Sequence, residues 1–192
     1  MLDKNNIFIL NLRIMKKSVF FIFFILGIFS SHAQQLAQNK SETKVEFKVK
    51  NFGVHVSGSF SEVDIISFID ISDLESSYIN AVIQVGSINT GNVKRDKHLL
   101  KNDFFDADHF PILKLKSTKI EKLSETNFIL KGKLTIKNTT KIISVPLELI
   151  LNNDSIIITS NFKINRRDYD VGGNIWVLDN NVKITVVYKA RI

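Results

Sequence analysis

The chain contains no cysteine, only two prolines and eight glycines among its 192 residues. Without cysteine it can form no disulfide, no thiolate nucleophile and no cysteine-bound metal site, and no lipid can be attached to a mature N-terminal cysteine. It also lacks a Walker phosphate-binding loop, a Rossmann glycine fingerprint and a G-x-S-x-G nucleophile elbow. These absences argue against thiol, nucleotide and esterase chemistry.

The longest apolar run, at residues 19–29, is short and lies near the beginning of the sequence. It follows a lysine pair and is followed by an A-x-A-like end at Ser31-His32-Ala33, which is the layout of a secretory signal peptide. A membrane-spanning helix needs about 20 apolar residues, so we expect cleavage near Ala33, with Met15 as the true start. An uncleaved N-terminal anchor is the alternative, because Ile7–Leu12 adds apolar residues upstream. The mature protein is expected to be periplasmic or secreted.

The positive charge of the chain is modest once residues 1–33 are set aside. The full sequence carries a formal net charge of +7, and the part beyond Ala33 carries a net charge of +4. Lysines there alternate with acidic and apolar residues instead of forming a basic run, which argues against nucleic acid as a partner.

Beyond residue 43, apolar and polar side chains alternate with a period of two, which predicts β-strands with one apolar face. The alternation is clear at Val45, Phe47 and Val49 and changes phase near Asn51–Gly53, which predicts a bulge, bend or break there. Further strands are expected at residues 65–71, 78–85, 112–120, 128–136, 143–151, 156–162 and 182–188.

Short polar connectors between these segments predict an antiparallel, largely up-and-down sheet. Since each strand has one apolar row, the sheet must stack on another sheet or close on itself, and the pattern leaves both sandwich and barrel open. One amphipathic helix is expected over Asn92–Asn102, where it would cap an open end. Residues 34–42 are predicted to be a short polar lead-in and residues 43–192 a single domain.

Titratable residues give no clear catalytic or metal-binding pattern. His55, His98 and His109 lack partners at metal-ligand spacing. Acid–base clusters occur at residues 95–98 and 166–168, but such neighbours more often form structural ion pairs or helix-end contacts. We therefore predict no catalytic residue, no metal and no cofactor.

Several ordered motifs resemble those of the YceI-like family, over roughly residues 43–191. They are Phe47-x-Val49-Lys50-x-x-x-Val54-x-Val56-x-Gly58-x-Phe60, Ser87-Ile88-Asn89-Thr90-Gly91, Arg95-Asp96-x-His98-Leu99, Asp103-Phe104-Phe105-Asp106, Phe110-Pro111, Gly132-x-Leu134-Thr135-Ile136-Lys137, Thr140-Lys141 with Pro146, and Asn165-Arg166-x-Asp168-Tyr169. Asn138 and Asp170 stand where the family usually has glycine. Since Asn and Asp tolerate positive φ, the turns are expected to survive.

The resemblance implies an all-β fold, an antiparallel up-and-down lipocalin-like barrel of about eight strands with one short capping helix. It also implies an apolar lumen that binds a polyisoprenoid or other long-chain lipid, with no established catalytic activity. The candidate lumen residues are Phe47, Val49, Phe52, Val54, Phe60, Leu99, Phe104, Phe105, Leu115, Phe128, Leu130, Leu134, Val145, Leu147, Ile158, Phe162 and Val186. The candidates for contact with a head group at the mouth are Arg95, Asp96, His98 and Arg166.

Three functional hypotheses follow. The leading one is an exported protein that holds a long-chain isoprenoid or acyl lipid for sequestration, transport or storage. The second is a ligand-free, stress-related structural or interaction module, because an eight-stranded barrel can be filled by its own side chains. The third is an enzyme that uses Arg95, Asp96 and His98. Transient contact with a membrane or a membrane protein is compatible with the sequence, as are a monomer and a homodimer.

Overall fold

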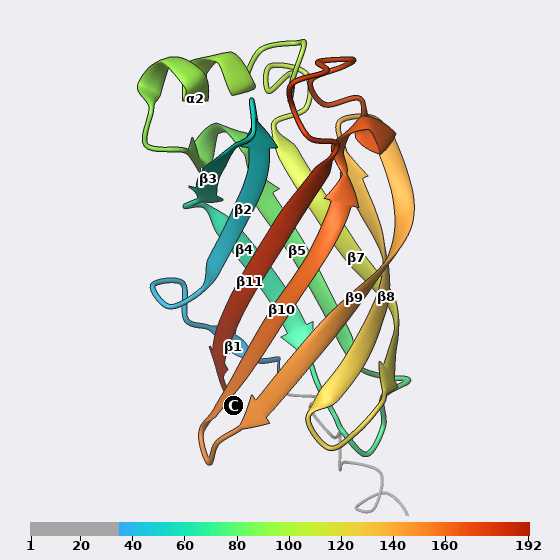
Figure 1. Cartoon of the computed structure of the whole chain (residues 1–192). Helices are drawn as coiled ribbons and strands as arrows, with labels where there is room; N and C mark the ends of the chain where they lie inside the picture. The colour runs from blue at the N-terminus through green and yellow to red at the C-terminus, as the bar shows by residue number, and fades with distance from the viewer. Residues whose placement is uncertain (1–34) are drawn as a thin grey trace, which may run out of the picture. The chain divides into compact units, whose positions relative to one another are not determined.

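The computed structural model describes residues 35–192, which fold as one curled antiparallel sheet with a single α-helix (Figure 1). The predicted signal peptide, residues 1–33, and its cleavage near Ala33 lie outside the described residues. No helix in residues 35–192 is long and apolar enough to span a membrane. The described residues belong to one compact unit, Gln34–Ile192, which contains both apolar clusters.

Strands account for most of the regular structure. They are β1 (Ala37–Gln38), β2 (Lys44–Asn51), β3 (Val54–Phe60), β4 (Val63–Phe68), β5 (Tyr78–Gln84), β6 (Ile88–Asn89), β7 (Ile112–Lys122), β8 (Asn127–Ile136), β9 (Thr139–Leu151), β10 (Ser155–Asn165) and β11 (Asn181–Arg191). The helical elements are η1 (Val85–Ser87), α2 (Val93–Leu99) and η2 (Arg166–Tyr169). All strand pairs are antiparallel, in the order β4-β5-β7-β8-β9-β10-β11-β2-β3-β6, with β1 beside β11.

The sheet closes because its two ends belong to neighbouring stretches of chain. Strand β3 runs into β4 through Ser61 and Glu62, and β5 runs into β6 through η1. The Ser61 amide donates to the Ser87 carbonyl at 3.3 Å, and the Gln84 amide donates to the Glu62 carbonyl at 3.0 Å. Strands β3 and β4 thus act as one long bent strand, and β5 and β6 act as another. These two bent strands pair with each other and connect β2 to β7. Counting each bent strand once gives the eight long strands of a barrel, which confirms the predicted fold.

Strand β1 lies within residues 34–42, the segment that the sequence predicted to be a short polar lead-in. It pairs with β11, and the Leu36 amide donates to the Ser67 carbonyl of β4 at 3.1 Å. The Gln38 side chain also bonds the backbone of β4, donating to Val63 and accepting from Ile65. This segment therefore fills the gap between β11 and β4. The sequence did not predict this role, because the segment contains a single leucine among mostly polar residues.

The turns that the sequence predicted are present, with two adjustments. The phase change near Asn51–Gly53 is a tight hairpin, with φ of +50° at Phe52 and +77° at Gly53. Asp170, which stands where the family usually has glycine, adopts positive φ as expected. In the β8–β9 hairpin, positive φ occurs at Lys137 and not at Asn138. The strand expected over residues 65–71 ends earlier, at Phe68.

Helix α2 is shorter than the expected Asn92–Asn102. The Asn92 side chain accepts from the Arg95 amide at 3.0 Å and caps the helix at its N-terminus. After Leu99 the chain turns back on itself, with the Phe105 amide donating to the Leu99 carbonyl at 3.0 Å. No helix residue is fully buried, and α2 lies beside the end of the barrel where β2 and β3 meet (Figure 1).

The inward-facing side chains form two apolar clusters along the barrel. We call the first the filled end; its buried members are Leu36, Val45, Val63, Ile65, Ile79, Ile120, Phe128, Leu130, Val145, Leu147, Leu149, Ile156, Ile158, Tyr188 and Ala190. We call the second the hollow end; its buried members are Val85, Phe104, Leu113, Ile136, Tyr169 and Val171. The Tyr188 hydroxyl is buried in the filled end but satisfied, 2.7 Å from the Ser67 hydroxyl.

Candidate functional site

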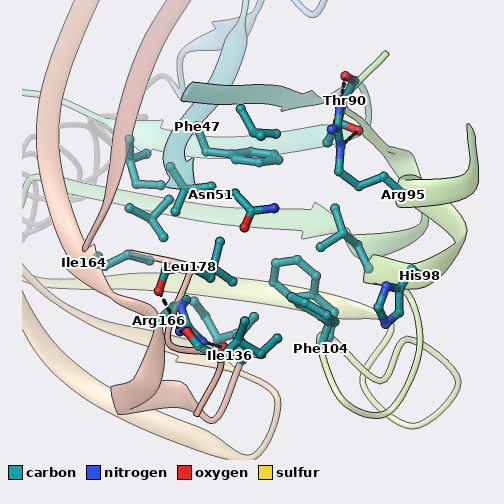
Figure 2. Close-up of a pocket in the computed structure, with 18 of the residues that line it drawn as sticks. Phe47, Asn51, Thr90, Arg95, His98, Phe104, Ile136, Ile164, Arg166 and Leu178 are labelled. Atoms are coloured by element: carbon teal, nitrogen blue, oxygen red, sulfur yellow. Dashed lines mark hydrogen bonds between the residues drawn. The ribbon is translucent and has the colours of Figure 1, made fainter. Parts of the chain in front are cut away.

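The hollow end contains a cavity of about 330 Å³. Its wall is built from six strands, helix α2 and the loops on either side of the mouth (Figure 2). The lining residues are Phe47, Val49, Asn51, Phe52, Val56, Phe60, Thr90, Arg95, His98, Leu99, Phe104, Phe105, Leu113, Ile136, Ile164, Arg166, Val171, Ile175, Val177, Leu178, Val182 and Ile184. All but Asn51, Thr90, Arg95, His98 and Arg166 are apolar, so the site favours hydrocarbon over polar ligands.

Two glycines let aromatic rings lie flat against the cavity wall. A Cβ at Gly58 of β3 would lie 2.4 Å from Cζ of Phe47, the residue opposite it on β2. A Cβ at Gly172, where φ is +70°, would lie 2.8 Å from Cε1 of Phe104. Glycine at these positions therefore shapes the space at the hollow end.

Arg166 is buried beneath the loop at residues 171–180, and protein acceptors take all of its N–H donors. Its Nε donates to the Asp179 carbonyl at 3.0 Å, and its Nη1 donates to the carbonyls of Val171 and Gly173 at 2.8 and 2.9 Å. Its Nη2 donates to the Ile175 and Leu178 carbonyls and to Oδ1 of Asn180, at 3.3, 3.0 and 3.2 Å. Desolvation, and then the nearby Arg167, lowers the pKa of Arg166 from its ordinary value.

Arg166 lines the cavity, as a residue predicted to contact a head group should, but its N–H donors are already engaged. A guanidinium has five N–H donors, and all five are occupied by the loop. Arg166 instead holds the loop in the position from which Val171, Ile175 and Leu178 line the cavity.

Arg95 differs from Arg166 because part of its guanidinium is free. Its Nε donates to Oγ1 of Thr90 at 2.7 Å, and its Nη2 donates to the Thr90 carbonyl at 2.8 Å. Asp96 does not line the cavity; its carboxylate accepts from the Thr90 amide at 2.9 Å and from the Thr90 hydroxyl. Nη1 of Arg95 has no acceptor within residues 35–192 and is not buried. Arg95 is thus the cavity-lining cation able to bind an anionic group.

His98 is held at the edge of the cavity by two neighbours. Its Nε2 lies 2.8 Å from a carboxylate oxygen of Asp103, and its ring lies edge-on to Phe104 with centroids 5.0 Å apart. Arg95 and Asp96 thus both bond Thr90, whereas His98 pairs with Asp103, and no hydrogen bond joins any two of Arg95, Asp96 and His98 within the described segment. In the same segment no three His, Asp or Glu side chains lie close enough to hold a metal ion.

The sequence-based lumen is larger than the observed cavity. Seven of its candidates line the cavity, namely Phe47, Val49, Phe52, Phe60, Leu99, Phe104 and Phe105. Nine others pack against neighbouring side chains instead, namely Phe128, Leu130, Val145, Leu147 and Ile158 within the filled end, Leu115, Phe162 and Val186 against it, and Leu134 against the hollow-end cluster. Val54 lies at the hairpin and is 67% exposed. The two sets of residues differ in how closely neighbouring side chains pack against them. The alternation of apolar residues in the sequence does not contain that information.

The candidate list also omits residues that line the cavity. They are Asn51, Val56, Thr90, Leu113, Ile136, Ile164, Val171, Ile175, Val177, Leu178, Val182 and Ile184. The strand residues among them belong to the alternating rows and could have been found by extending those rows. Residues 171–178 have no period, so only the tertiary fold brings them to the site.

Comparison with known proteins gives the family and the fold. Residues 37–190 match the model of the YceI-like domain. The chain is 30% identical over 139 residues to UPF0312 protein YE1254 of Yersinia enterocolitica, covering 72% of this chain and 69% of the relative. The match to a UPF0312 protein of Photorhabdus laumondii spans 55% of that relative's length.

Two solved structures share the architecture at low sequence identity. The crystal structure of Burkholderia cenocepacia BcnA has a TM-score of 0.77 at 22% identity, covering 80% of this chain and 99% of that one. A polyisoprenoid binding domain from Saccharophagus degradans, implicated in plant cell wall breakdown, has a TM-score of 0.66 at 15% identity, covering 82% and 97%. At these identities the likeness concerns the fold alone.

Proposed function

The chain belongs to the YceI-like family, and from that premise we propose that it is an exported, non-enzymatic protein that binds a polyisoprenoid or similar long-chain lipid. The observation that carries the proposal is the apolar cavity at the hollow end. The polyisoprenoid named for the Saccharophagus degradans domain supports the choice of ligand class. Sequestration, transport and storage are all compatible with such a site.

The size of the cavity limits how much of a ligand it encloses. Its volume of about 330 Å³ lies at the lower end of the range of roughly 300–1,000 Å³ for small-molecule sites. Each buried CH₂ contributes about 0.8 kcal/mol, so about ten carbons would supply about 8 kcal/mol before ordering costs. That is close to micromolar affinity. A longer polyisoprenoid would extend through the mouth.

A second feature of the proposal is a preference for an anionic head group, supported by the free Nη1 of Arg95. Charge-assisted hydrogen bonds to phosphate are stronger than neutral ones. Arg95→Gln should weaken binding of a prenyl phosphate roughly tenfold or more, relative to the matching prenyl alcohol. Arg95→Lys keeps the charge and serves as the control. Equal losses for both ligands would contradict this role of Arg95.

Native mass spectrometry of residues 34–192, purified without detergent, tests lipid binding directly. We expect bound mass in a long-chain lipid range that organic extraction removes, and rebinding of prenyl lipids afterwards. An unchanged ligand-free mass after incubation with prenyl and acyl lipids would contradict the proposal and favour the side-chain-filled interaction module. Export is tested separately, by the intact mass of the protein recovered from outside the cytoplasm.

A further inference from the structure

Four apolar residues beside the mouth of the cavity are turned towards solvent. Trp176 is 91% exposed, Phe52 73%, Val54 67% and Ile175 38%. We call these four residues the rim cluster. The rings of Phe52 and Trp176 meet edge-on with centroids 6.5 Å apart, and Phe52 and Ile175 also line the cavity. The rim cluster is therefore continuous with the apolar wall inside.

The rim cluster is held in place by backbone hydrogen bonds. The Phe52 amide donates to the Val177 carbonyl at 2.9 Å, and the Asp179 amide donates to the Lys50 carbonyl at 2.8 Å. Arg166 bonds the Ile175 carbonyl from below. The exposure of these side chains is thus a property of a tethered structure, and an apolar partner would meet a surface that is already formed.

Phe52 has both an exposed aromatic ring and a strained backbone, and both are unfavourable. Its φ is +50°, in a two-residue hairpin where Asn-Gly is the preferred sequence. A bulky aromatic in the left-handed region is unfavourable and here gains little from burial. Such a residue is better explained by a contact made outside the barrel.

Lysines cover the outer face of the barrel next to the rim cluster. Lys163, Lys183 and Lys48 lie side by side on β10, β11 and β2, and Lys50 lies two residues before Phe52. Within residues 35–192 none of these four lysines forms a salt bridge.

His55 lies near three of these lysines. Desolvation, followed by the charges of Lys48, Lys50 and Lys183, lowers the pKa of His55 from its ordinary value. Glu46 is the one acidic residue of β2, and it lies farther from the hairpin than Lys48. Adjacent like charges are unfavourable by themselves, and an anionic partner would offset their repulsion.

We propose that the rim cluster inserts into the surface of an anionic lipid bilayer while these lysines contact its head groups, so that lipid passes between bilayer and cavity. The proposal rests on the lipid-binding function proposed above. A membrane fits the observations better than a protein partner, because stable protein interfaces use about 20–30 residues a side. Four apolar residues beside lysines are instead typical of interfacial membrane contact.

Vesicle binding of residues 34–192 tests the proposal. The probes are vesicles of phosphatidylcholine alone and vesicles in which about a quarter of the lipid is phosphatidylglycerol. Trp176 is the only tryptophan of the chain, so its emission reports insertion directly. We expect a blue shift and co-sedimentation with the anionic vesicles, both weakened by salt. No binding, or equal binding to both vesicles, would overturn the proposal.

Three variants test whether vesicle binding depends on the rim cluster and the lysines beside it. Trp176→Gln should weaken co-sedimentation roughly tenfold. Replacement of Lys48, Lys50 and Lys183 by Gln should weaken it about fivefold per lysine. The matched control is Leu123→Gln, a similarly exposed residue (65%) in the β7–β8 turn at the filled end, which should change nothing. Equal losses in the control and in Trp176→Gln would overturn the proposal.

Uptake of a short prenyl alcohol from vesicle-free solution separates this proposal from the function on which it rests. Trp176 does not line the cavity, so Trp176→Gln should retain that uptake. If the unmodified protein takes up the prenyl alcohol but does not bind vesicles, the proposed membrane contact is wrong and the proposed lipid-binding function stands. Loss of uptake in the unmodified protein would overturn the proposed function.

Discussion

The two ends of the barrel share strands such as β2, β8, β10 and β11 but differ in packing and in backbone strain. On β11, Tyr188 and Val186 contribute to the filled end, whereas Ile184 and Val182, farther along the same inward row, line the cavity. All four non-glycine residues with positive φ in the described chain, Phe52, Asp106, Lys137 and Asp170, belong to turns around the hollow end.

This difference indicates a division of roles. Close packing of large side chains stabilises a fold, and the filled end provides it. Cavities and strained turns cost stability, and they are retained where function requires them. We therefore infer that the hollow end carries the proposed ligand site and that the filled end contributes most of the stability. The following predictions test that division.

The largest expected effect is the removal of a core ring. Phe128→Ala, at a residue 1% exposed in the filled end, should lower the free energy of unfolding by about 3–5 kcal/mol. Phe47→Ala should cost only about 1–2 kcal/mol, because Phe47 borders empty space and loses mainly its contact with Phe60. Urea denaturation measures both. Equal losses would contradict the comparison.

Arg166→Lys should produce the next largest effect. An ammonium has three donors and cannot replace the six hydrogen bonds of Arg166. We expect a loss of about 2–4 kcal/mol, with faster amide hydrogen exchange in residues 171–180. Arg167→Lys, at the exposed neighbouring position, is the control and should change stability by less than about 0.5 kcal/mol. Unchanged exchange in the loop would show that Arg166 does not hold it.

Enlarging one side chain at each end should separate stability from binding. Val145→Phe, in the filled end, should cost about 1–3 kcal/mol through overpacking. Val49→Phe places its ring in the cavity, so it should cost less than about 1 kcal/mol and prevent uptake of a prenyl alcohol. Denaturation and a ligand titration on both variants check this. Normal uptake by Val49→Phe would place the ligand elsewhere.

The smallest expected effect is a gain of stability. Phe52→Asn replaces a strained aromatic by the residue that the hairpin prefers, so the free energy of unfolding should rise by on the order of 1 kcal/mol. Leu123→Asn, in a turn at the filled end, should give no such gain. A loss of stability in Phe52→Asn would mean that its contact with Trp176 matters more than the strain.

The sequence predicted the strands and the family well because both depend on local patterns. The alternation around Phe47 identifies β2, and the phase change at Asn51–Gly53 identifies the hairpin. The order of motifs from Arg95 to Pro111 indicated the family, and with it the choice of barrel over sandwich.

The position of the cavity could not be predicted in the same way. Phe47 and Phe128 both occupy inward positions in alternating rows, yet one lines the cavity and the other is packed. Their difference arises from neighbours distant in sequence, such as the loop held by Arg166. The network around Arg166 could not be predicted either, since most of its partners are backbone carbonyls that no side-chain pattern reveals.

Methyl NMR with labelled isoleucines is the most direct test of the claim that one end binds lipid and the other does not. With a bound prenyl alcohol of about ten carbons, contacts should appear from the ligand to the methyls of Ile136, Ile164 and Ile184. Ile156 and Ile158, in the filled end, should show none. Ligand contacts to Ile156 and Ile158, or no contacts to Ile136, Ile164 and Ile184, would contradict the account.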